Sequence, residues 1–83
     1  MWIRATERLS GLRALVDRAT RTRTWDASVA SIFRSTLLEI ADPPATLTST
    51  QRDEYVERVR RLHAAIDEEA ANSGVHWNYS SKH

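Results

Sequence analysis

Cysteine is absent from this 83-residue sequence, and glycine and proline occur only twice each. Without cysteine the chain can form neither a disulfide nor a zinc site built from thiolates. No HExxH or GxSxG motif occurs, and the two glycines, Gly11 and Gly74, lie too far apart to form a phosphate-binding loop. Because these motifs are missing, we expect a protein that is not an enzyme and that holds no metal and no cofactor.

Long hydrophobic runs are also missing. Four charged residues, Arg4, Glu7, Arg8 and Arg13, interrupt the apolar pattern of residues 1–16. This leaves no segment suited to a signal peptide or a membrane span. We therefore expect a cytoplasmic protein with no membrane association.

The short chain limits the size of its own hydrophobic core. A domain of this length buries only about 60–65% of the surface that its unfolded chain exposes. Since disulfides are excluded, association with another chain is the main remaining support for so small a fold. We expect a homo-oligomer, or a complex with another protein, to add to its stability.

Apolar residues near both ends recur at spacings of three and four, which places each set on one face of a helix. The first stripe consists of Trp2, Ala5, Leu9, Leu12, Val16 and Ala19, and the second consists of Tyr55, Val59, Leu62 and Ile66. The sequence therefore predicts one helix over residues 3–20. It predicts another from a Thr48 cap, with Gln51 completing a capping box, to about residue 72 before Gly74. Gly11 inside the first helix predicts a close crossing of another backbone at that point.

A middle helix is predicted over residues 27–41, capped by Thr24 or Asp26 and stopped by Asp42-Pro43-Pro44. Its apolar face is expected to hold Trp25, Val29, Ile32, Phe33, Leu37 and Ile40. The polar strip is narrow and consists mainly of Ser28, Ser31, Ser35 and Glu39. This helix is therefore expected either to lie at the centre of the fold or to touch a second molecule.

These elements predict an all-α fold, a three-helix bundle over residues 1–74 followed by an aromatic C-terminal tail over residues 75–83. One alternative keeps residues 3–41 as a single helix of roughly 58 Å at 1.5 Å per residue. Such a rod has more apolar surface than the last helix covers, so it would form an intertwined homodimer.

Basic residues gather in the first third of the chain, although the net charge is only +1. Residues 1–24 contain six arginines against Glu7 and Asp17. One face of the first helix and the following turn hold Arg4, Arg8, Arg18, Arg21 and Arg23. They could contact phosphates while Trp25 stacks on a base, so a nucleic-acid-binding regulator is the second function considered.

A third function considered is a small helical enzyme. The segment that contains Leu9, Leu12, Arg13, Val16 and Asp17 resembles the opening helix of small all-helical chorismate mutases. The resemblance covers nine residues. Such an enzyme needs further basic residues along the same helix, but Ala30 and Ala41 stand at those positions, so no family is assigned.

Charged residues of the last predicted helix fit a solvent-exposed face. Glu54 precedes Arg58, and Glu57 precedes Arg61, each by the four residues that bring side chains together on a helix. His63 and Asp67 have the same spacing, but two ligands do not make a metal site.

The function that the sequence favours is a protein-binding helical module, such as an adaptor, an inhibitor or an accessory subunit. Leu38 is predicted on the outer side of the middle helix, where a partner could cover it. Trp77 and Tyr79 lie among polar residues of the tail, a setting typical of aromatic anchors at interfaces. Leu38, Trp77 and Tyr79 are therefore the predicted contact residues, and the sequence does not identify the partner.

Overall fold

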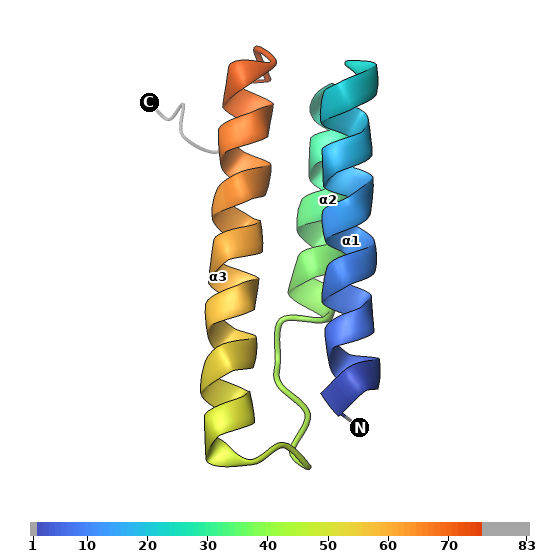
Figure 1. Ribbon diagram of the computed structural model, residues 1–83. Helices are drawn as coiled ribbons and strands as arrows, with labels where there is room; N and C mark the ends of the chain where they lie inside the picture. The colour runs from blue at the N-terminus through green and yellow to red at the C-terminus, as the bar shows by residue number, and fades with distance from the viewer. Residues whose placement is uncertain (1, 76–83) are drawn as a thin grey trace, which may run out of the picture.

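Three helices make up the computed structural model, which describes residues 2–75: α1 (Trp2–Thr22), α2 (Ala27–Glu39) and α3 (Ser49–Asn72). The chain runs up, down and up again, so α1 and α3 are parallel and α2 is antiparallel to both (Figure 1). No strand occurs among the described residues. The predicted three-helix bundle is confirmed, and the single helix over residues 3–41 is wrong because the chain reverses between Arg23 and Asp26.

The N-terminal caps follow from local sequence. Asp26, rather than Thr24, caps α2, since its carboxylate accepts a hydrogen bond from the Val29 amide at 2.8 Å. At α3 the Thr48 hydroxyl accepts from the Gln51 amide, and the Gln51 side chain accepts from the Thr48 amide, both at 3.1 Å. This reciprocal pair is the predicted capping box.

Both long helices end in the same backbone motif. The amide of Thr24 donates to the carbonyl of Ala19 at 3.0 Å, and the amide of Val75 donates to the carbonyl of Ala70 at 2.8 Å. The residue before each donor has a positive φ, 56° at Arg23 and 82° at Gly74. Glycine adopts this left-handed conformation freely, whereas an L-residue with a side chain is strained by about 1–2 kcal/mol. The turn after α1 therefore forms despite an unfavourable residue.

The core is built from all three helices and two residues of the connections between them, Trp25 and Leu47. The buried residues are Ala5, Leu9, Leu12, Val16, Ala19, Trp25, Ala30, Phe33, Leu37, Leu47, Tyr55, Leu62, Ile66 and Ala70. Both predicted stripes are thus largely buried, with Trp2 and Val59 half-buried at their edges. Ile32 is an exception, because it was expected in the apolar face of α2 but is 61% exposed.

Tyr55 connects the beginning of α3 to the end of α2. Its hydroxyl donates a hydrogen bond to the carbonyl of Ile40, just after the last turn of α2. Burial raises the pKa of Tyr55, with Arg8 lowering it and Asp42 raising it to smaller extents. Leu47 is buried in the same connection, so the segment between α2 and α3 is fixed by packing as well as by hydrogen bonding.

Gly11 does not mark a helix crossing within the described chain. A Cβ placed there would meet nothing within 4 Å beyond its own helix and chain neighbours, and the residue is exposed on α1. The predicted close approach of another backbone at Gly11 is therefore wrong for this bundle.

The two left-handed positions make a matched test of the helix ends. We expect Arg23→Gly to raise the free energy of unfolding by about 1 kcal/mol, because glycine removes the strain. Gly74→Ala should lower it by about the same amount for the opposite reason. Urea unfolding followed by circular dichroism measures both. A less stable Arg23→Gly variant would contradict the assignment of strain to this turn.

Candidate protein-interaction surface

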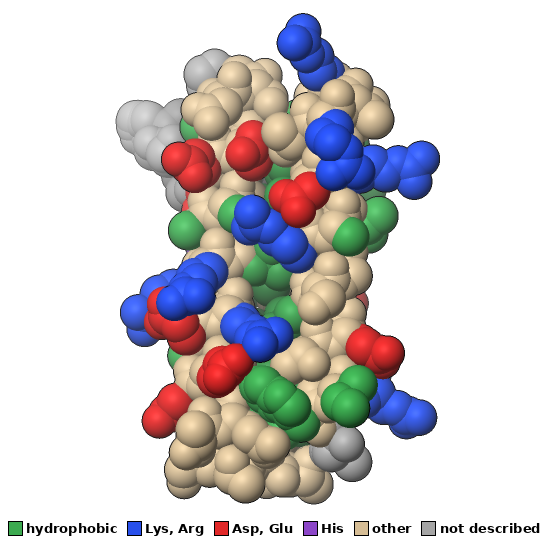
Figure 2. All heavy atoms as spheres, viewed as in Figure 1, with side chains coloured by type: hydrophobic (Ala, Val, Ile, Leu, Met, Phe, Trp, Pro, Cys, Tyr) green, Lys and Arg blue, Asp and Glu red, His purple; other side chains and the backbone are tan. Residues whose placement is uncertain are grey.

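A groove between α1 and α3 has a volume of about 710 Å³. Leu9 of α1 and Leu62 of α3 line it together with charged residues. Figure 2 looks onto this side of the molecule and shows apolar side chains in the floor of the groove, with basic and acidic side chains on both rims.

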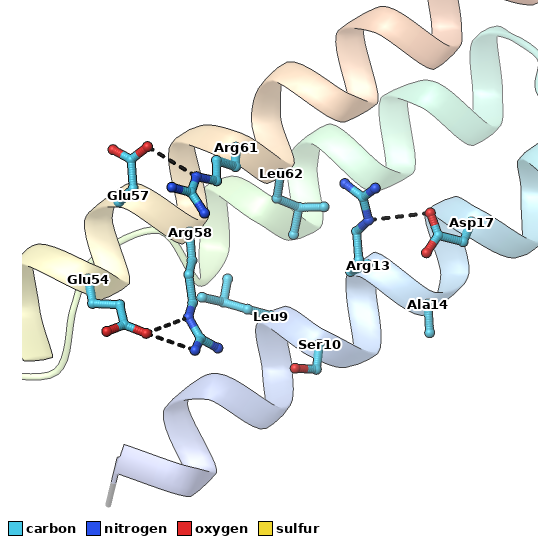
Figure 3. Close-up of a pocket in the computed structure, with 10 residues that line it drawn as sticks. All are labelled: Leu9, Ser10, Arg13, Ala14, Asp17, Glu54, Glu57, Arg58, Arg61 and Leu62. Atoms are coloured by element: carbon cyan, nitrogen blue, oxygen red, sulfur yellow. Dashed lines mark hydrogen bonds and ion pairs between the residues drawn. The ribbon is translucent and has the colours of Figure 1, made fainter.

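The charges around this groove are paired within each helix. The ion pairs are Arg13–Asp17 at 3.3 Å, Arg58–Glu54 at 2.8 Å and Arg61–Glu57 at 3.2 Å, all at a separation of four residues (Figure 3). The pairs predicted for the last helix are therefore present. Since each arginine lies beside a carboxylate, the groove has no excess positive charge to attract an anion.

This pairing bears on the chorismate mutase resemblance. Arg13 and Asp17 belong to the resembling segment, and here they bind each other.

Arg58 reaches from α3 to lie over the ring of Trp2, 5.5 Å from the ring centroid, which adds a cation–π contact across the groove.

A second groove, between α1 and α2, is apolar at its centre. It has a volume of about 440 Å³, and its lining includes Leu15, Val29, Ile32 and Phe33. Two of these side chains project into solvent, with Leu15 52% and Ile32 61% exposed. Arg18 also lines the groove, and no acidic residue does.

The outer side of α2 continues this apolar groove. Ser28, Ser31 and Ser35 are exposed there, and Leu38, at the next position of the same spacing, is 65% exposed. We call Ser28, Ser31, Ile32, Ser35 and Leu38 the α2 face. None of these five residues is charged, but Glu39, the fourth member of the predicted polar strip, is exposed beside them. Arg34 is directed toward Asp67 of α3 at 3.8 Å. Because this side of α2 is open to solvent, the helix is not central to the fold, and the remaining expectation is contact with a second molecule.

Of the three predicted contact residues, the structure describes one. Leu38 lies on the outer side of α2, as expected. Trp77 and Tyr79 lie outside the described residues. Leu15 was not among the predicted contact residues, because the side of α1 opposite the stripe was interpreted from its arginines. The signal was a large apolar residue between Arg8 and Arg18 on that side.

The five arginines of the nucleic-acid alternative are all exposed, but they form two groups. Arg4 and Arg8 share a small hollow with Glu39 and Asp42. Arg18, Arg21 and Arg23 lie toward the other end of α1, and no carboxylate of the described residues lies within 4.0 Å of their guanidinium nitrogens.

Trp25 is not available for base stacking. It is 8% exposed, its indole N–H donates to the Thr20 hydroxyl at 3.0 Å, and its ring meets that of Phe33 edge to face at 5.2 Å between centroids. The expected stacking role of Trp25 is therefore wrong, because the side chain belongs to the core.

His63 and Asp67, the two potential metal ligands predicted on the last helix, lie close together. Nδ1 of His63 lies 3.5 Å from Oδ2 of Asp67. Within residues 2–75 no three or more His, Cys, Asp or Glu side chains come together in a way that could hold a metal ion. None of the three described helices has the length and hydropathy to cross a membrane.

Comparison with known proteins identified no protein-family model, no curated protein and no solved structure that matches this chain.

The core position of Trp25 can be tested by two substitutions. Trp25→Ala should lower the free energy of unfolding by about 3–5 kcal/mol, because it leaves a cavity beside Phe33. Trp25→Phe should cost less, since it preserves the ring contact and removes only the hydrogen bond to Thr20. Urea titrations give both values. Unchanged stability in both variants would show that Trp25 is dispensable to the core.

Proposed function

We propose that this chain is a cytoplasmic protein-binding helical module that contacts another protein chain through the α2 face and the adjoining groove beneath Leu15 and Ile32. The observation that supports it best is the exposure of Ile32 and Leu38 at 61% and 65% on a helix side whose other members are mainly serines. Exposed apolar groups that gather at a groove are typical of interaction sites.

The contrast between the two grooves also supports this proposal. Along the α1/α3 groove each arginine has a carboxylate partner, so that side is satisfied within the chain. The α1/α2 groove combines apolar side chains with Arg18, which has no such partner among the described residues. An apolar centre with a charged rim is the usual anatomy of a protein interface. Trp77 and Tyr79 stay predicted contacts of the tail.

Capture of partner proteins from the native host tests the proposal. Ile32→Glu should abolish capture, since it places a carboxylate in the apolar groove. Ile3→Glu is the matched control, because Ile3 is 72% exposed but does not line the α1/α2 groove. Truncation after Val75 tests the tail in the same assay. The proposal fails if the wild-type chain captures nothing, or if both isoleucine variants capture equally well.

A nucleic-acid-binding function is the second candidate, and the cluster of Arg18, Arg21 and Arg23 favours it. If these side chains bind phosphates, affinity for DNA or RNA should fall steeply as salt rises. Arg18→Ala combined with Arg21→Ala should then reduce the salt slope by about one unit for each phosphate that is no longer neutralised. Arg4→Ala combined with Arg8→Ala is the control, because those residues lie beside Glu39 and Asp42. No binding at low salt would exclude this candidate.

A further inference from the structure

We infer that the partner covering the α2 face is a second copy of this chain, whose α2 packs antiparallel to the first in a two-fold symmetric dimer. This inference rests on the proposed function, because it names the partner of the same surface. It is carried by three features of the described residues: small side chains along α2, apolar groups near its middle, and opposite charges at matching distances from that middle.

The small side chains permit a close helix–helix approach. Ser28, Ser31, Ser35 and Leu38 follow one another at spacings of three, four and three, which is the spacing of a packed helix–helix stripe. Three of these four are serines, so the backbones of two α2 helices can approach nearer than bulky side chains would allow. The α2 face itself contains no charged residue. Glu39 borders it four positions after Ser35, so an antiparallel pair centred on Ser35 separates the two Glu39 side chains along the helix axes.

Two-fold symmetry places the apolar groups around the axis. We place the two-fold axis beside Ser35 of an antiparallel α2 pair. A residue that precedes Ser35 by a given number of positions then lies level with the partner residue that follows Ser35 by the same number. Leu15 of α1 lines the same groove as Ile32 and Phe33 of α2, so it lies within about one helical turn of Ser35 and the axis. Leu15 and Ile32 already line one groove, and the symmetry brings two such grooves together. The exposed apolar groups of each copy then cover those of the other.

The charges match in the same arrangement. Arg18 lines the same groove as Val29 and Ile32, which puts it near the level of Ser31. The two-fold axis puts the partner's Glu39 level with Ser31 as well. Glu39 lies on the α1 side of α2, because it shares a hollow with Arg4 and Arg8. The two-fold axis runs between the copies and perpendicular to both α2 helices. Both α1 helices therefore lie on the same side of the α2 pair. Arg18 therefore meets the partner's Glu39, and symmetry forms this pair twice.

Sedimentation equilibrium of the purified chain tests the dimer, with circular dichroism confirming that each variant is helical. The wild-type chain and the control Ile3→Glu should dimerise. Ile32→Glu should be monomeric. Arg18→Glu or Glu39→Arg should each weaken dimerisation at least about tenfold, because residue 18 then faces a residue 39 of the same charge at two places in the dimer.

Mixing the two charge variants gives the decisive measurement. One chain with Arg18→Glu and one with Glu39→Arg form two opposite-charge pairs across a heterodimer, so the mixture should dimerise at concentrations where each variant alone is monomeric. A monomeric wild-type chain, a dimer that survives Ile32→Glu, or a mixture that stays monomeric would each overturn the inference. A monomeric chain that still captures another protein through Ile32 overturns only the dimer and leaves the proposed function standing.

Discussion

The reversal of the chain after α1 is the constraint on which the rest of the structure depends. With the left-handed backbone at Arg23 the apolar stripe of α1 folds back against α2 and α3, whereas a continuous helix would leave it unpaired. The residue at this position is unfavourable, so other interactions must hold the turn. Trp25 supplies them, since its ring packs on Phe33 and its N–H binds Thr20 on the last turns of α1. Packing of one large aromatic thus offsets local backbone strain.

The ends of the helices could be predicted from sequence because capping is local. Asp26, Thr48 and Gly74 act through residues only a few positions away, and the observed helices begin and end close to the predicted bounds. What each helix faces is not local. Ile32 and Phe33 are neighbours in an apolar pattern, yet one is exposed and the other is buried, because α1 and α3 cover only part of the circumference of α2. Leu15 was missed for the same reason.

The candidate surface was accordingly predictable only in part. The narrow serine strip and Leu38 indicated a side of the middle helix that could meet a second molecule. Predicting the adjoining groove would have required knowing how α1 packs against α2, because Leu15 and Ile32 lie seventeen positions apart in the sequence. The charge composition did not distinguish the two grooves either. The grooves differ in whether their arginines have carboxylate partners. Arginines of the α1/α3 side have carboxylates one helical turn away, and Arg18 does not.

The odd number of helices has a consequence for how this bundle can sit within a larger arrangement. An up-down-up path brings the chain in at one end, near Trp2, and lets it leave at the opposite end, near Val75 (Figure 1). The long axis of α3 alone spans roughly 36 Å at 1.5 Å per residue. Groups attached before Trp2 and after Val75 would thus lie at opposite ends of the bundle. A two- or four-helix hairpin arrangement would instead bring both attachments to the same side.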